Sequence, residues 1–170
     1  RVEAYGTVDE LNSAIGVAIA EVSFPRKRES IGSSIKSRTD RVEDDNLERE
    51  LIKIQNDLLD IGSALANPKV KPLENLKRRV KEFEDFIDEM TDAMPKLSNF
   101  ILPGGGKTGA TLQFARAVSR RAERRVVKLA EKEPIDSNIV MYMNRLSDLL
   151  FTMARFINFK EKQKEIIWTK

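Results

Sequence analysis

Three charged side chains within eight residues are the strongest candidates for chemistry in this sequence. Arg116, Arg120 and Glu123 are separated by four and then three residues, so a helix would present all three on one face. Guanidinium groups held in this way can bind a polyanion such as a nucleotide triphosphate. The alternative is a solvated charged stripe, which is the commoner outcome for such a pattern on an isolated helix.

A second unusual segment runs from residue 142 to residue 151, where polar side chains interrupt an apolar helical pattern. These side chains are Asn144, Arg145, Ser147 and Asp148. Arg145 and Asp148 have the i, i+3 spacing of an ion pair, and we interpret them as structural. A coiled-coil scaffold would explain the apolar repeats but not these polar residues among them. The two segments together favour a binding or catalytic site.

The composition limits the chemistry that this site can perform. The 170 residues contain no cysteine and no histidine, which excludes a thiolate nucleophile, the usual general base and the commonest transition-metal ligand. We therefore predict catalysis by positioning and charge, or by a reagent that is already reactive, and no protein metal site. Thirty basic residues against 27 acidic ones do not form a nucleic-acid footprint. No apolar run approaches the ~20 residues of a membrane span, and no signal-peptide pattern occurs, so we expect a cytoplasmic protein.

Apolar residues spaced by three and four positions predict five amphipathic helices. The first begins with the capping box Thr7–Glu10, and the third begins at Pro72. The expected spans are about 7–22, 47–65, 72–90, 108–131 and 136–160. Residues 23–46 lack the pattern, and we predict a long exposed loop or insertion there. Residues 1–170 therefore form one all-α domain, a five-helix bundle.

The glycine-rich segment before the fourth predicted helix is similar to a phosphate-binding loop in its Gly106-Lys107-Thr108 sequence. Ile101 stands where a Walker A motif requires its first glycine, and no strand precedes it; we therefore reject that assignment. We interpret the segment as a turn that leads into a helix N-terminus, where backbone N–H groups can meet an anion.

Four blocks, taken together and in order, resemble the PduO-type ATP:cob(I)alamin adenosyltransferases. They are RVEAYGTVDELN at 1–12, FILPGG at 100–105, ARAVSRRAER at 115–124 and YMNRLSDLLF at 142–151. The resemblance implies a ferritin-like homotrimer of five-helix bundles with the active site between adjacent subunits. It also implies transfer of the 5′-deoxyadenosyl group of ATP, with Mg²⁺ present, to reduced cobalamin. The implied partners are these two substrates and a cobalamin-dependent enzyme that receives the product, with neither nucleic acid nor membrane.

The resemblance also assigns roles to individual residues. Arg120 and Asn144 would contact ATP, and Glu123 would orient the arginine or the nucleotide. Arg116 would pair with Asp9 across the subunit interface, which makes Arg120, Arg116 and Asp9 the expected catalytic set. Without the resemblance, Asp9 is a carboxylate in the first turn of a helix, where the helix dipole favours it.

Two aromatic residues are the expected contacts of the corrinoid. Phe100 would lie in the corrinoid pocket, where it would help to displace the lower ligand of cobalt, and Phe151 would line the same pocket. Without the resemblance, both side chains would be interpreted as core residues.

This sequence departs from the family pattern in two places. Gln113 stands where the family usually has histidine, and an amide can still donate and accept hydrogen bonds. The glycine- and threonine-rich segment that wraps the ATP phosphates in the family does not occur in this sequence. A second hypothesis is therefore an N-terminally truncated, non-catalytic bundle that binds or holds corrinoid without turnover.

Overall fold

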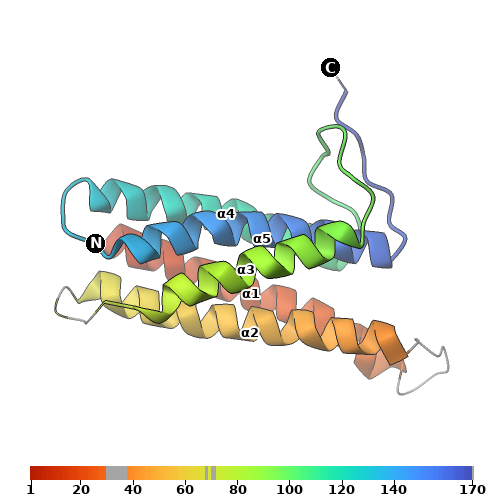
Figure 1. Cartoon of the computed structure of the whole chain (residues 1–170), viewed down its shortest axis with the longest axis horizontal. Helices are drawn as coiled ribbons and strands as arrows, with labels where there is room; N and C mark the ends of the chain where they lie inside the picture. The colour runs from red at the N-terminus through yellow and green to blue at the C-terminus, as the bar shows by residue number, and fades with distance from the viewer. Residues whose placement is uncertain (30–37, 68, 70–71, 170) are drawn as a thin grey trace.

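The computed structural model describes residues 1–29, 38–67, 69 and 72–169, with side chains described outside 23–45. Within these residues the secondary structure consists of five helices and one isolated β-bridge. The helices are α1 (Val2–Glu29), α2 (Arg38–Ala66), α3 (Asn75–Asp92), α4 (Lys107–Ala130) and α5 (Ser137–Lys160). They lie roughly along one long axis (Figure 1). The predicted all-α, five-helix bundle is confirmed.

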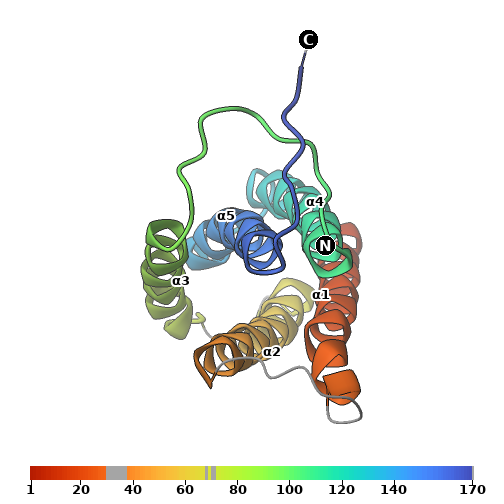
Figure 2. The ribbon, with the colours of Figure 1, turned by 90° about the vertical axis from the view of Figure 1, so that its right-hand side faces the viewer.

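Helix α5 lies between α3 and α4, and α1 packs against both α2 and α4 (Figure 2). The predicted apolar stripes form the core: Leu51, Ile54, Leu58 and Ile61 of α2 are fully buried. Burying a leucine or isoleucine side chain contributes about 1.5–3 kcal/mol. Because α5 has neighbours on two sides, burial extends over most of its circumference from Ile139 to Asn158. No helix in the described part of the chain is long and apolar enough to cross a membrane.

The predicted start of the first helix at Thr7 is wrong. Helix α1 begins at Val2, and the Thr7 hydroxyl donates a hydrogen bond to the Glu3 carbonyl inside the helix instead of capping it. Ala4 and Val8 are both buried, so the apolar stripe begins one turn earlier than expected. The burial of these two side chains favours a helical backbone before Thr7 and outweighs the capping signal of the sequence around Thr7.

The loop predicted for 23–46 is wrong at both ends, because α1 continues to Glu29 and α2 begins at Arg38. A helix can continue beyond its apolar stripe, since each added residue forms one more backbone hydrogen bond. Residues 30–37 of that prediction lie outside the described residues.

Pro72 does not begin the third helix, which starts three residues later at Asn75. The Leu73 N–H donates to Asp136 Oδ2 at 2.9 Å, which ties the chain to the turn before α5. The other Asp136 oxygen accepts from the Asn138 N–H and caps α5. One carboxylate therefore organises both connections.

A buried charged cluster joins α2, α3 and α5, and the sequence analysis missed it. Arg79 of α3 is 4% exposed and contacts Asp57 Oδ2 at 2.7 Å and Glu50 Oε1 at 2.6 Å. The Tyr142 hydroxyl donates to the same Asp57 oxygen at 2.9 Å. Burial alone lowers the pKa of Arg79, but the hydrogen bonds that Arg79 donates to the carboxylates of Asp57 and Glu50 outweigh it and raise that pKa well above its ordinary value.

The loop 93–106 and the tail 161–169 lie side by side and project from the bundle; together they are called the arm (Figures 1 and 2). The Leu102 N–H donates to the Ile166 carbonyl and the Trp168 N–H to the Phe100 carbonyl, both at 2.8 Å. These two bonds flank the β-bridge between Ile101 and Ile167. The tail, which offered no signal in the sequence, thus supports the loop that carries Phe100.

Candidate functional site

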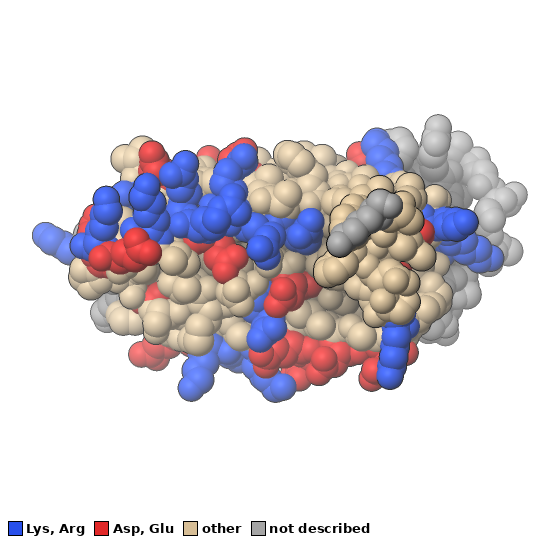
Figure 3. All heavy atoms as spheres, turned by 90° about the horizontal axis from the view of Figure 1, so that it is seen from above, with Lys and Arg blue, Asp and Glu red and all other residues tan. Residues whose placement is uncertain are grey.

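The predicted charged face lies on α4, which is at the top of the bundle in Figure 1. Seen from above, basic side chains form a nearly continuous band along it (Figure 3). The exposed members on α4 are Arg120, Arg121, Arg124, Arg125 and Lys128. This surface offers an anion several guanidinium groups from a single rigid helix.

Arg116 stands at the edge of this band and is only partly exposed. Its Nε donates to Gln113 Oε1 at 2.8 Å, so the amide at this position orients the guanidinium. The guanidinium carbon lies 5.9 Å from the centre of the Phe151 ring, a cation–π contact. Burial, followed by the positive charge of Arg120, lowers the pKa of Arg116. A bound anion would relieve the repulsion between the two arginines.

Glu123 and Asn144 meet across α4 and α5. Asn144 Nδ2 donates to Glu123 Oε1 at 2.8 Å, which orients the amide and leaves its oxygen to accept from a ligand. Arg120 is exposed one turn before Glu123. Within the described part of the chain, no hydrogen bond or ion pair joins Arg120 to another residue. A charged donor without a partner therefore lies on the same face as an oriented amide–carboxylate pair.

Asp9 lies exposed on α1, and its predicted pairing with Arg116 of a neighbouring subunit stays a prediction. Within the chain, α1 and α4 are joined by other pairs: Glu10 with Arg121, and Glu3 with Arg125 at 3.0 Å. These pairs use other carboxylates of α1 and leave Asp9 exposed.

Phe100 is not a core residue, because it is 79% exposed. It lies in the arm, where its ring makes an edge-to-face contact with Trp168 at 6.3 Å between centroids. Both rings line an open cleft of about 560 Å³ together with Leu97, Ser98 and Asn99. An exposed aromatic pair at the mouth of a cleft is suited to a flat, largely apolar ligand.

Phe151 lies beneath Arg116, and no contact among the described residues joins it to Phe100. The shared corrinoid pocket that the sequence analysis expected stays a prediction. Arg145 and Asp148 form an ion pair at 3.0 Å, and Arg145 also reaches Glu84 of α3 at 3.2 Å. Their predicted structural role agrees with these contacts.

Two buried polar residues of α5, Arg155 and Asn158, were missed by the sequence analysis. Arg155 contacts Glu165 at 2.8 Å and the Pro95 carbonyl at 3.2 Å. Asn158 contacts the backbone of Gly104 and Gly106. The only signal in the sequence was a polar residue within an apolar stripe, which does not identify its partner.

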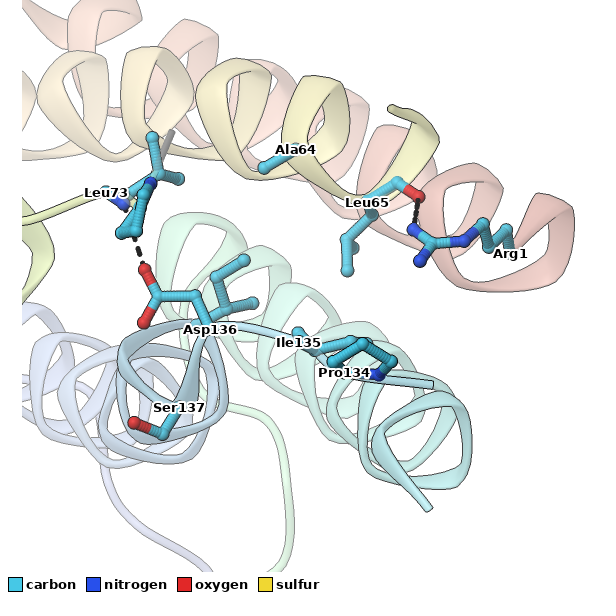
Figure 4. Close-up of a pocket in the computed structure, with 10 residues that line it drawn as sticks. Arg1, Ala64, Leu65, Leu73, Pro134, Ile135, Asp136 and Ser137 are labelled. Carbon is cyan, nitrogen blue, oxygen red and sulfur yellow. Dashed lines mark hydrogen bonds between the residues drawn. The ribbon is translucent and has the colours of Figure 1, made fainter. Parts of the chain in front are cut away.

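A second cavity, of about 390 Å³, lies at the end of the bundle opposite the arm. Its walls come from the end of α2, the turn before α5 and Arg1, whose guanidinium donates to the Leu65 carbonyl (Figure 4). It is lined by none of the predicted site residues.

Comparison with known proteins assigns the family. The family model described as cobalamin adenosyltransferase matches residues 1–157. The chain belongs to the cobalamin adenosyltransferase family. This family member is 43% identical over 175 residues to the corrinoid adenosyltransferase of Homo sapiens, an alignment that covers 99% of this chain and 63% of the human protein. It is 42% identical over 159 residues to the corrinoid adenosyltransferase of Bacillus subtilis, covering 93% of this chain and 74% of that protein.

The fold agrees with solved structures of the same family. A variant PduO-type ATP:corrinoid adenosyltransferase from Lactobacillus reuteri, complexed with cobalamin and ATP, superposes with a TM-score of 0.78 at 33% identity. That match covers 100% of this chain and 86% of the other. The resemblance drawn from the four sequence blocks is therefore confirmed.

Proposed function

We propose that this chain transfers the 5′-deoxyadenosyl group of ATP to the cobalt of cob(I)alamin, giving adenosylcobalamin and triphosphate. The observation that carries the proposal is the oriented Glu123–Asn144 pair, with 2.8 Å between Nδ2 and Oε1, beside Arg120, which has no partner among the described residues. Family membership and the ATP and cobalamin bound in the Lactobacillus reuteri structure support the same conclusion.

The chemistry needs little from the protein beyond alignment and charge. The electron pair of Co(I) forms a bond to C5′ of ATP while the C5′–O bond breaks, and triphosphate leaves with those bonding electrons. Because Co(I) is itself the nucleophile, the reaction requires neither a thiolate nor a histidine base, and the sequence contains neither. Arg120 and Arg116 would neutralise the leaving triphosphate, and Mg²⁺ would enter as the counter-ion of ATP.

The complete site would form between neighbouring subunits of a homotrimer. Asp9 of one chain would pair with Arg116 of the next, holding the arginine band against the ATP. Phe100 would lie against the corrin with Phe151 lining the same pocket, and the product would pass to a cobalamin-dependent enzyme.

The decisive experiment follows the corrinoid spectrum under strictly reducing conditions. We expect the cob(I)alamin absorption to convert to that of adenosylcobalamin when ATP and Mg²⁺ are added, with one triphosphate released per adenosyl group. If ATP and corrinoid both bind but no product forms, the proposal is wrong and the non-catalytic corrinoid-holding hypothesis replaces it.

A further inference from the structure

Both ends of the loop in the arm are fastened to one face of α5. Arg155 donates to the Pro95 carbonyl near the start of the loop at 3.2 Å. Asn158, one turn further along α5, contacts the glycine turn that ends the loop. Both side chains are buried, at 8% and 3% exposed. Phe100 lies between these two attachment points.

Asn158 binds the backbone at this end of the arm through both ends of its side-chain amide and through its own carbonyl. Its Oδ1 accepts from the Gly106 N–H at 3.0 Å, and its Nδ2 donates to the Gly104 carbonyl at 2.9 Å. Its own carbonyl accepts from the Gln163 N–H at 2.8 Å, where the tail leaves α5. One residue therefore holds the loop and the tail together.

The Asn158 side chain lies so close to the backbone of Gly105 and Gly109 that neither position has room for a Cβ atom. Gly105 has φ +110°, and a Cβ there would lie 2.2 Å from Asn158 Oδ1. A Cβ on Gly109, in the first turn of α4, would lie 2.1 Å from the same oxygen. At Gly109 the three nearest atoms all belong to the Asn158 side chain, whereas Gly105 is also restricted by its backbone conformation.

We propose that Asn158 is a positioning residue that sets the place of Phe100 at the corrinoid cleft by bracing the Gly104–Gly106 turn. The proposal rests on the proposed function, because it takes the Phe100 cleft to be the corrinoid site. The Asn158 side chain donates to and accepts from backbone groups of the arm, and Asn158 is not a catalytic residue. Its loss should therefore weaken corrinoid binding and leave ATP binding, on the α4 face, nearly unchanged.

Trp168 provides a readout that does not depend on activity. It is the sole tryptophan of the sequence, and it contacts the Phe100 ring. In Asn158→Ala we expect stronger acrylamide quenching and a red-shifted emission, because the Gly104–Gly106 turn would no longer be fixed to α5 and the Phe100 ring would no longer be held against Trp168. Asn56→Ala is the matched control, since Asn56 is an exposed asparagine of α2 that bonds only within its own helix; its emission should match the parent chain.

Steady-state kinetics test the functional half of the proposal. The loss of two hydrogen bonds predicts a rise of about tenfold in the corrinoid KM of Asn158→Ala, against less than about twofold for ATP. Equal changes in the two KM values, or an unchanged Trp168 signal, would overturn it. If the alanine variant does not fold, Asn158→Leu, which keeps the side-chain shape without its hydrogen bonds, takes its place.

A double-mutant cycle identifies Asn158 as the cause. Gly109→Ala should displace Asn158 and reproduce the Trp168 and corrinoid effects, but should add little in the Asn158→Ala background, where its obstacle is gone. Gly105→Ala should change the Trp168 signal and the corrinoid KM in both backgrounds, because a residue with a Cβ is strained at φ +110°. Additive effects of Gly109→Ala and Asn158→Ala would contradict the proposal.

The two kinds of failure are distinguishable. If the parent chain forms no adenosylcobalamin, the proposed function fails, while the Trp168 cycle still decides whether Asn158 positions the arm. If the parent chain is active and the Trp168 fluorescence is the same in the parent chain and in the Asn158 and Gly109 variants, the proposed function stands and the positioning role is wrong.

Discussion

At the residue scale, the central question is what Arg120 contributes. Its neighbours each have a partner: Arg116 bonds to Gln113, Arg121 to Glu10, and Glu123 to Asn144. Arg120 is the member of the predicted triad that has no hydrogen bond or ion pair among the described residues. A charge without a partner on a band of like charge favours a polyanionic ligand.

Arg120→Ala should therefore weaken ATP binding without unfolding the bundle. A charge-assisted hydrogen bond to phosphate contributes about 1.5–3 kcal/mol, so we expect the ATP Kd to rise by about 10- to 100-fold, measured by calorimetry. Arg125→Ala is the control, because it removes an exposed arginine of the same helix whose partner is Glu3. Equal losses in both variants would mean that ATP responds only to the net charge of the band.

At the scale of the elements, the buried cluster on Arg79 fixes α3 against α2. A buried charge pair adds little over an apolar replacement, but removing one partner leaves the other charge buried and unpaired. Here the carboxylates of Asp57 and Glu50 share the Arg79 guanidinium, and without it Asp57 would keep only the Tyr142 hydroxyl and Glu50 only Lys53 among the described residues. Because α3 leads directly into the arm, the cluster also fixes the start of the loop that carries Phe100.

Arg79→Met should lower the free energy of unfolding by about 3–5 kcal/mol. Its neighbour Arg78 gives a matched control, since it is exposed and its one ion pair among the described residues, to Glu82 at 3.5 Å, lies on the surface. Arg78→Met should lower the free energy of unfolding by less than about 1 kcal/mol. Urea unfolding of the two variants measures the difference, and similar values for both would show that the cluster is not coupled to stability.

Tyr142 makes the same cluster sensitive to alkaline pH. Burial and then the Asp57 carboxylate raise the pKa of Tyr142 well above its ordinary value. The folded state therefore holds the phenolic proton more tightly than the unfolded state, whose pKa is about 10. The stability that this provides is complete below about pH 10 and is lost as the pH rises toward the folded pKa.

Tyr142→Phe should lower the free energy of unfolding by about 1–2 kcal/mol at neutral pH, because the hydrogen bond to Asp57 is lost. The difference in unfolding free energy between the parent chain and the variant should decrease above about pH 10, because the variant has no phenol to ionise. Denaturant unfolding at a series of pH values tests this, and a constant difference across the series would contradict the assigned cause.

At the scale of the whole molecule, the proposed site needs two subunits. Asp9 lies on α1 and Arg116 and Arg120 on α4, and within one chain α1 and α4 already contact each other through Glu10 and Glu3. The proposed pairing of Asp9 with Arg116 of a second copy would be additional to these contacts. A closed ring in which α1 of one chain meets α4 of the next would give every interface the same pair.

Mixed trimers of two inactive variants test this arrangement. Asp9→Ala and Arg120→Ala homotrimers should each be nearly inactive, but co-expression should restore activity at interfaces where both residues are intact. With random assembly, roughly a quarter of the interfaces would qualify. No recovery, or a chain that sediments as a monomer, would place the whole site within one subunit.

The sequence alone determined the five helices, their apolar stripes and the band on α4, because these depend on local spacing that a helix repeats every 3.6 residues. It also pointed to the Asp136 region as the start of α5, since a cap and its helix are neighbours in the chain. The error at Thr7 has the same origin: a local cap signal was outweighed by burial of Ala4 and Val8 in the assembled core.

Only the tertiary structure decided which distant polar groups meet. The contacts of Arg79 with Asp57, of Asn158 with Gly104 and of Trp168 with Phe100 join segments that are far apart in sequence. Each partner is an ordinary residue in its own helix or loop, without a local signal. The assembled bundle and arm bring these groups together, and a buried polar group must find its partner among the residues that the fold places beside it.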